Sequence, residues 1–244
     1  MHKVLDLFSG IGGFSLGLER TGGFETVAFC ECCPKAQKVL NKHWASVPIY
    51  NDIKDLTNEK LQASGIVPTV ICGGFPCTDI STASSGKQTG IVGSRSGLWK
   101  EMLRLAKNVR PKWVLAENVS ALRSQGLALV LQDFCDIGYM CEFHTIPASY
   151  LGAPHHRSRI WIIARCNSNK NREPVMSFND EAQGVQEHSS FNFWKGGTSV
   201  ESAVVGVADG VSRRLDRLRM IGNSLVPQIP EMIGNAILEH EKTD

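Results

Sequence analysis

The segment Gly73-Gly74-Phe75-Pro76-Cys77 combines residue types that suit nucleophilic chemistry. It follows the short apolar run 69–72, which predicts a buried strand. The two glycines permit a sharp exit from that strand, and Pro76 restricts the backbone directly before the sulfur. Open α/β sheets bind their ligands beyond the carboxyl ends of the strands. Cys77 is therefore either a nucleophile on a stiff loop or a structural cysteine in a tight turn.

Three further strand ends carry residues that suit an adenosine ligand. The first predicted strand is followed by the turn Ser9-Gly10-Ile11-Gly12-Gly13, which allows a ligand to approach the backbone. The second is followed by Glu31, where a carboxylate typically binds ribose hydroxyls. The third ends at Asp52, whose carboxylate can accept a hydrogen bond from an adenine amino group. Because the sequence has neither a Gly-x-Gly-x-x-Gly pattern nor a lysine after these glycines, dinucleotides and ATP are less favoured.

Apolar runs alternate with helical patterns along the chain, and they predict the elements that position these residues. Strands are predicted over residues 4–8, 26–30, 48–52, 69–72, 113–116, 141–146 and 159–164, the fifth ending at Glu117. Helices are predicted from residue 14 onward and over 35–44, 98–109 and 230–240. This alternation indicates an α/β fold with a doubly wound, mainly parallel sheet and a terminal hairpin-like pair of strands. The pattern does not predict the strand order.

The overall composition is that of a soluble globular protein. The 244 residues are 42% hydrophobic and 20% charged, enough for one full domain with an appendage or for two modest domains. No apolar run approaches the roughly 20 residues that span a bilayer. The first residues show no signal-peptide pattern. We therefore expect a cytoplasmic protein with no membrane partner.

The cysteines and the basic residues each leave two interpretations. Eight cysteines without a repeating spacing argue against a disulfide framework. Cys30, Cys32 and Cys33 are close together, but no second Cys/His pair has a finger-like spacing, so we expect no metal site. The net charge of +2 does not decide for or against nucleic acid. Two basic clusters provide either phosphate contacts or solvated surfaces: His155, His156, Arg157, Arg159 and Arg165, and Arg213, Arg214, Arg217 and Arg219.

Two stretches interrupt the alternation of strands and helices. Residues 84–97 are rich in serine and glycine and follow the Cys77 loop directly, which is typical of a mobile active-site lid. Residues 166–207 are polar, with little periodicity. Regular structure is expected to resume near Leu215.

Five motifs occur in an order that resembles the DNA (cytosine-5) methyltransferase family. They are Asp6-Leu7-Phe8-Ser9-Gly10-Ile11-Gly12-Gly13, Gly73 to Cys77 with Thr78-Asp79-Ile80-Ser81, Glu117-Asn118-Val119, Arg157-x-Arg159 and Gly222-Asn223-Ser224. The resemblance covers nearly the whole chain apart from residues 166–207, and residues 209–223 resemble short phage- or prophage-type members. It implies a Rossmann-like fold, S-adenosylmethionine as cofactor and double-stranded DNA as substrate.

The resemblance assigns catalytic roles to four residues. Cys77 would add to C6 of cytosine, which makes C5 nucleophilic. Glu117 would bind the N3/N4 edge of the base and supply a proton at N3. Arg157 and Arg159 would hold O2 and the adjoining phosphate. The target cytosine would be flipped out of the duplex, since a stacked base cannot meet a thiol inside the protein.

The resemblance also assigns cofactor contacts. Phe8 would stack near the adenine, Glu31 would bind the ribose, and Leu98 would line the methyl-donor pocket. Residues of the Phe8 and Leu98 types are more often simple core residues, but the resemblance favours the functional role. Asn223 would complete the cofactor wall, unless it is an ordinary turn residue. The full predicted cofactor set is Phe8, Ser9, Gly10, Gly12, Gly13, Glu31, Asp52, Ile53, Leu98 and Asn223.

Three positions depart from the family pattern. Thr78 replaces a common glutamine, Cys32 replaces an apolar or aromatic residue, and His155-His156 replaces Gln-Arg or Gln-Lys. These departures affect contacts to the base and the adenine, whereas the nucleophile, the acid and the arginine pair are all present.

The expected organisation is a catalytic, cofactor-binding domain over 1–165, a small target-recognition region over 166–207 and a segment over 208–244 that packs back on the catalytic domain. We expect a monomer, with a cognate restriction endonuclease as a possible partner. Two other functions stay open: a tRNA cytosine-5 methyltransferase and a non-catalytic DNA-binding regulator of the same fold. The intact Cys77, Glu117 and arginine pair argue against the regulator.

Overall fold

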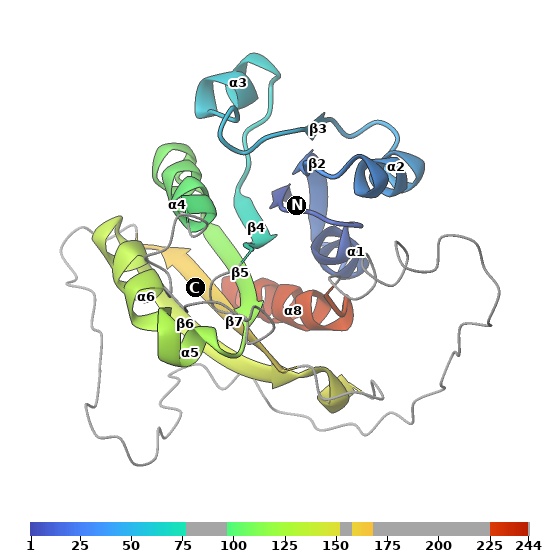
Figure 1. The fold of residues 1–244 in the computed structure, drawn as a ribbon. Helices are drawn as coiled ribbons and strands as arrows, with labels where there is room; N and C mark the ends of the chain where they lie inside the picture. The colour runs from blue at the N-terminus through green and yellow to red at the C-terminus, as the bar shows by residue number, and fades with distance from the viewer. Residues whose placement is uncertain (77–96, 152–157, 168–224, 244) are drawn as a thin grey trace, which may run out of the picture.

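A computed structural model describes residues 1–76, 97–151, 158–167 and 225–243 (Figure 1). In this part of the chain, one sheet of seven strands has the order β3-β2-β1-β4-β5-β7-β6. The strands are β1 (His2–Leu7), β2 (Phe24–Cys30), β3 (Ile49–Tyr50), β4 (Val70–Gly74), β5 (Trp113–Val119), β6 (Tyr139–Pro147) and β7 (Ser158–Cys166). Strands β1 to β5 run parallel to one another, and β7 is antiparallel to both β5 and β6. The predicted α/β fold with a mainly parallel sheet and a terminal antiparallel pair is confirmed.

Helices connect the strands. They are α1 (Gly13–Arg20), α2 (Pro34–His43), α3 (Asn58–Ala63), α4 (Gly97–Val109), α5 (Leu122–Gln125), α6 (Leu127–Asp136) and α8 (Gln228–Thr243), with the 3₁₀ turn η2 (Ala148–Leu151). Three of them, α3, α5 and α6, were not predicted from the sequence. None of the helices in the described ranges is long and apolar enough to cross a bilayer.

The sheet separates two hydrophobic cores. Side chains alternate between the faces, so Val114 and Ala116 of β5 join one core while Trp113 and Leu115 join the other. The first core is covered by α4 and α6, and the second by α1 and α8 (Figure 1). Both faces of the parallel strands are therefore buried, as in other doubly wound sheets.

The strand order reverses between β1 and β4, which makes this point the topological switch of the sheet. Leu7 of β1 lies opposite Gly73 of β4. A Cβ atom on residue 73 would lie 2.5 Å from the carbonyl oxygen of Leu7, so only glycine permits this approach. The switch places the glycine turn after β1 beside the loop that leads to Cys77.

Several predicted strand boundaries were wrong. β1 ends at Leu7, so Phe8 lies in the following turn, and β4 continues through Gly73 and Gly74, which were expected to leave the strand. β3 contains only two residues, so Asp52 lies in the turn that follows rather than in the strand. β5 continues through Glu117 to Val119, because Asn118 and Val119 still pair with Ile160 and Arg159 of β7. Glu117 is consequently held by a strand rather than by a loop.

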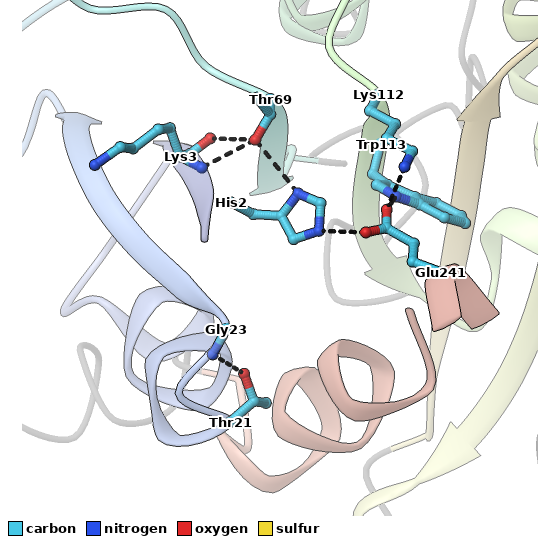
Figure 2. Close-up of polar contacts among 8 residues, drawn as sticks. All are labelled: His2, Lys3, Thr21, Gly23, Thr69, Lys112, Trp113 and Glu241. Atoms are coloured by element: carbon cyan, nitrogen blue, oxygen red, sulfur yellow. Dashed lines mark hydrogen bonds and ion pairs between the residues drawn. The ribbon is translucent and has the colours of Figure 1, made fainter. Parts of the chain in front are cut away.

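The amino-terminal edge of the sheet is tied to the last turn of α8 (Figure 2). The carboxylate of Glu241 accepts hydrogen bonds from Trp113 Nε1 at 2.9 Å and Lys112 Nζ at 2.8 Å, and its Oε2 lies 3.0 Å from His2 Nε2. The backbone N–H of Lys3 in turn donates to Thr69 Oγ1 at 2.9 Å. One carboxylate thus connects α8 with the starts of β1 and β5.

The Glu241→Gln substitution is expected to lower the free energy of unfolding by about 2 kcal/mol at neutral pH, because it removes a charged acceptor from three donors. Burial raises the pKa of Glu241, but hydrogen bonds from Lys112 and Trp113 outweigh it and lower the pKa to about 2. Because the pKa of Glu241 is lower in the folded state, the ionised carboxylate stabilises the fold at pH values above the unfolded-state pKa near 4.5. This stabilisation is lost as the pH falls toward 2. In urea unfolding at pH 7 and pH 3.5, the difference in unfolding free energy between the wild type and Glu241→Gln should therefore be smaller at the lower pH. The exposed Glu239→Gln on the same helix is the matched control, and equal effects of both variants would contradict the anchoring role.

Candidate functional site

The turn after β1 has an unusual backbone conformation. Phe8, Gly10 and Gly12 all have positive φ angles, of 53°, 54° and 83°. For Phe8, which is not a glycine, this left-handed conformation costs of order 1–3 kcal/mol and is typical of functional sites. Ser9 stabilises the turn, since its hydroxyl donates to the carbonyl oxygen of Asp6 at 2.6 Å and its own carbonyl accepts from Gly12 N at 2.8 Å.

Glu31 joins the ends of the first three strands. Its Oε2 accepts from the backbone N–H of Gly10 at 2.7 Å, and its Oε1 accepts from that of Cys33 at 2.8 Å. Its own N–H donates to the carbonyl oxygen of Tyr50 at 2.9 Å. The carboxylate is therefore fixed in orientation beside the glycine turn, as the predicted ribose contact requires.

The remaining described members of the predicted cofactor set lie along the same edge. Asp52 is exposed at the start of the turn after β3. Ile53 is 3% exposed and its side chain belongs to the core, so that side chain is not available to a ligand. Leu98 lies in the first turn of α4, half-buried and packed against the first core. A core role for Leu98 is therefore present in the structure, and its proposed contact to a cofactor is an additional role.

A pocket opens at the switch point of the sheet. It joins the glycine turn to the end of β5, and its lining residues are Phe8, Ser9, Gly10, Ile11, Gly13, Phe14, Gly74, Glu117 and Leu225. Four of these residues were not among the predicted catalytic or cofactor-binding residues: Ile11, Phe14, Gly74 and Leu225. Leu225 was signalled by its place two residues after Asn223, whereas nothing in the sequence separates Phe14 from an ordinary core residue.

Glu117 has a partner and a defined space in this pocket. Its Oε1 lies 2.9 Å from Nε of Arg159, with 14% of the Glu117 side chain and 24% of the Arg159 side chain exposed. Gly74 lies opposite Glu117 in the β4–β5 register, and a Cβ atom on residue 74 would lie 2.9 Å from Glu117 Oε2. The structure thus brings together two of the four predicted catalytic residues, and glycine at 74 leaves room for the carboxylate.

Asn118 connects β5 to the loop that leads to Cys77. The side chain is 3% exposed, and its Nδ2 donates to the carbonyl oxygen of Phe75 at 2.9 Å. Its Oδ1 accepts from the backbone N–H of Val119 at 2.7 Å. This geometry agrees with the expected supporting role of Asn118 and anchors the chain two residues before Cys77.

Several predicted features lie outside the described residues. They are Cys77, Thr78, the His155-His156 pair, Arg157, Asn223, the lid over 84–96 and the recognition region from residue 168 onward. The roles assigned to them stay predictions.

The sequence model of the C-5 cytosine-specific DNA methylase family matches residues 2–203, which include the glycine turn, the Cys77 loop and the Glu117–Arg159 pair. The chain belongs to this family. Among curated relatives, it is 37% identical over 170 residues to the Type II methyltransferase M2.BsuMI of Bacillus subtilis, covering 66% of this chain and 41% of the relative. It is 40% identical over 173 residues to M.HindV of Haemophilus influenzae, covering 69% and 55%. The chain therefore spans about half the length of these relatives.

A solved structure supports the fold independently. DNMT2 of Spodoptera frugiperda matches with a TM-score of 0.57 at 21% identity, over 82% of this chain and 61% of that chain. This likeness concerns the fold alone. The sequence comparison thus identifies the family, and the structural comparison supports the Rossmann-like fold.

Three cysteine thiols in the described residues are poor nucleophiles. Burial raises the pKa of Cys30 to about 12 and also raises the pKa values of Cys72 and Cys141. Because the thiolate is the reactive form, these side chains stay neutral and unreactive near pH 7. They do not compete with Cys77 for the predicted chemistry.

A buried carboxyl group lies beneath the glycine turn. Asp6 is 1% exposed, and its Oδ2 accepts from the hydroxyl of Ser15 at 2.8 Å. Burial raises the pKa of Asp6 to about 7, although the hydrogen bonds from Ser15 lower it in part. Asp6 therefore titrates near neutral pH in the folded protein.

The Asp6→Asn variant is expected to change the pH dependence of stability. A raised pKa means that the folded state binds the Asp6 proton more tightly than the unfolded state does. The resulting contribution to the free energy of unfolding is present below pH 4 and is lost as the pH rises toward 7. The free energy of unfolding of the wild type, relative to Asp6→Asn, should therefore decrease by a few kcal/mol between pH 4 and pH 7.5. Urea unfolding of both proteins across this range measures the difference. Parallel pH profiles would contradict a pKa near 7.

Proposed function

We propose that this protein transfers a methyl group from S-adenosylmethionine to C5 of cytosine in double-stranded DNA. The observation that carries the proposal is the Glu117 carboxylate, which is ion-paired with Arg159 and lines one pocket with the glycine turn. A carboxylate paired with a guanidinium suits the N3/N4 edge and O2 of cytosine, and the glycine turn suits an adenosine group. A methyl donor and a cytosine would therefore meet at the switch point of the sheet.

The residues present fit S-adenosylmethionine. Glu31 is held by the N–H groups of Gly10 and Cys33, so its carboxylate is aimed before a ribose arrives. Among the described residues, a Cβ atom built on Gly10 meets nothing within 4 Å, which suits the approach of a ligand to the turn. Phe8 and Asp52 would contact the adenine ring and its amino group. When bound, the cofactor supplies an electrophilic methyl group.

The protein side chains would activate the cytosine ring. The Cys77 thiolate would form a bond from its sulfur to C6, and the electron pair displaced from the C5–C6 double bond makes C5 nucleophilic. Glu117 would hold a proton at N3, which neutralises the charge that the ring gains during this attack. Arg159 would stabilise O2 and fix the Glu117 carboxyl, with which it is already paired. Gly74 leaves Glu117 the space for this orientation.

The substrate would be a flipped cytosine. A stacked base in B-DNA cannot reach a pocket at the end of a sheet, so extrusion of the nucleotide is required. We propose that Arg157 holds the adjoining phosphate, that residues 84–97 close behind the base, and that residues 166–207 contribute to target recognition. We also propose that the protein is a cytoplasmic monomer. Because relatives are named Type II methyltransferases, we propose in addition that it acts with a cognate restriction endonuclease.

Methyl transfer from labelled S-adenosylmethionine to mixed duplex DNA tests the proposal, with tRNA as a parallel substrate. Label is expected in duplex DNA only. Bisulfite sequencing of DNA from a host that expresses the protein should then reveal methylated cytosines in one short sequence. Label in tRNA alone would assign the protein to RNA, and label in neither substrate would contradict the proposed activity.

A further inference from the structure

A single arginine holds the turn that follows β3. Nη2 of Arg104, on α4, donates to the carbonyl oxygens of both Ile53 and Leu56, each at 2.9 Å. Nε of Arg104 donates to Oε2 of Glu101 at 2.7 Å, which fixes the guanidinium one turn of helix away. The turn from Asp52 to Leu56 is therefore attached to α4 through two main-chain oxygens.

The same turn determines where the Asp52 carboxylate points. Oδ1 of Asp52 accepts from the backbone N–H of Lys54 at 2.9 Å, and its carbonyl oxygen accepts from Asp55 N at 3.1 Å. Asp52 itself is exposed, whereas Ile53 and Leu56 are buried at 3% and 1% exposure. The two carbonyl groups held by Arg104 thus belong to the buried side of the turn whose exposed end carries Asp52.

An arginine is well suited to this attachment. Its guanidinium is always charged and planar, so it binds two carbonyl oxygens with a fixed geometry that a neutral side chain cannot reproduce. Arg104 and Glu101 are 31% and 26% exposed, so the attachment is partly shielded from solvent. Because β3 contains only two residues, the strand itself provides little restraint on the turn.

We propose that Arg104 is a positioning residue for adenine selectivity: through the 53–56 turn it holds Asp52 where the amino group of the cofactor's adenine would bind. This inference rests on the proposed function, because it assumes an adenosine ligand along this edge. Arg104 touches neither the ligand nor the reacting atoms, and it acts through Asp52. The helix that carries Leu98 thereby also sets the position of the adenine contact.

The test compares two ligands that differ at the adenine amino group. S-adenosylhomocysteine has this group, and S-inosylhomocysteine carries an oxygen in its place. Calorimetric titration of wild-type protein should show a preference for the adenosyl compound, and Arg104→Gln should reduce this preference about tenfold, since a charge-assisted hydrogen bond is lost. The KM for S-adenosylmethionine should rise by a similar factor with kcat unchanged. Lys107→Gln, an exposed substitution on the same helix, should match the wild type in both measurements.

A double-mutant cycle identifies the route of the effect. In an Asp52→Ala background, Arg104→Gln should cause no further loss of preference. If Arg104→Gln lowers the affinity for both ligands equally, Arg104 has only a structural role and the inference fails. If Arg104→Gln does not fold, Glu101→Gln provides the milder variant and should shift the preference in the same direction; an unchanged preference there would overturn the inference. A wild-type protein that binds neither compound would instead contradict the proposed function.

Discussion

Cys77→Ser is expected to lower methyl transfer to cytosine by at least about a thousandfold, as is typical when a covalent nucleophile is removed. An alcohol ionises far less readily than a thiol, so the serine oxygen would not add to C6 at neutral pH. The structure supports the site from the preceding residues: β4 ends at Gly74, and Asn118 holds the Phe75 carbonyl at 2.9 Å. Initial rates with labelled S-adenosylmethionine measure the loss.

A trapping experiment distinguishes loss of the nucleophile from loss of fold. Duplex DNA that carries 5-fluorocytosine should form a covalent, denaturation-resistant complex with the wild type, because the fluorine blocks release of the enzyme. Cys77→Ser should still bind DNA and form no such complex. Cys135→Ser, a half-buried cysteine on α6, is the matched control and should trap as the wild type does. A covalent complex formed by Cys77→Ser would place the nucleophile at another residue.

Glu117→Gln is expected to reduce kcat by 10²- to 10³-fold, about the contribution of a general acid. Glutamine has nearly the same shape and its carbonyl oxygen can still accept from Arg159, so the 2.9 Å contact is expected to persist. The amide cannot carry the proton that cytosine N3 requires. Single-turnover rates at saturating DNA and S-adenosylmethionine measure the chemical step.

The binding of S-adenosylhomocysteine separates the two roles that the pocket permits for Glu117. Since Glu117 lines the same pocket as the glycine turn, it could act on the base or on the cofactor. For a base-directed role, Glu117→Gln should keep the affinity for S-adenosylhomocysteine within about threefold, because no cofactor contact is removed. A parallel loss of affinity and rate would reassign the residue to the cofactor. Glu142→Gln, which changes a partly buried carboxylate on β6 outside the pocket lining, should leave both quantities unchanged.

The chemistry of Glu117 could be predicted from the sequence, but its partner geometry could not. The motif Glu117-Asn118-Val119 identifies the acid. The ion pair between Glu117 and Arg159 follows only from the antiparallel register of β5 and β7, in which Val119 lies opposite Arg159. Strand order and register depend on contacts between distant segments, which local residue patterns do not encode. The inserted position of β7 between β5 and β6 is such a long-range feature.

Two of the three missed helices, α5 and α6, lack strong local signals, whereas α3 has a side-chain cap at Thr57 and the acidic Glu59 in its first turn. α6 begins after Gly126 with no side-chain cap, and its Leu127–Asp136 sequence has no acidic residue in the first turn. α5 is only four residues long. By contrast, α2 was predicted closely because Pro34 marks its first turn. Tertiary packing rather than capping determines where α6 forms, since Val130 and Phe134 are completely buried.

The contact between His2 and Glu241 joins residues 239 positions apart in the chain. During synthesis, the face of β1 in the second core is covered by α1 but stays incompletely covered until α8 has been synthesised. The strands can pair earlier, but Ile229, Ile233 and Ile237 reach the second core only at that stage. Because this contact closes a long loop, docking of α8 is expected to be a late step in the folding of this domain. Until then, the nascent sheet presents an apolar surface on which chaperones can bind.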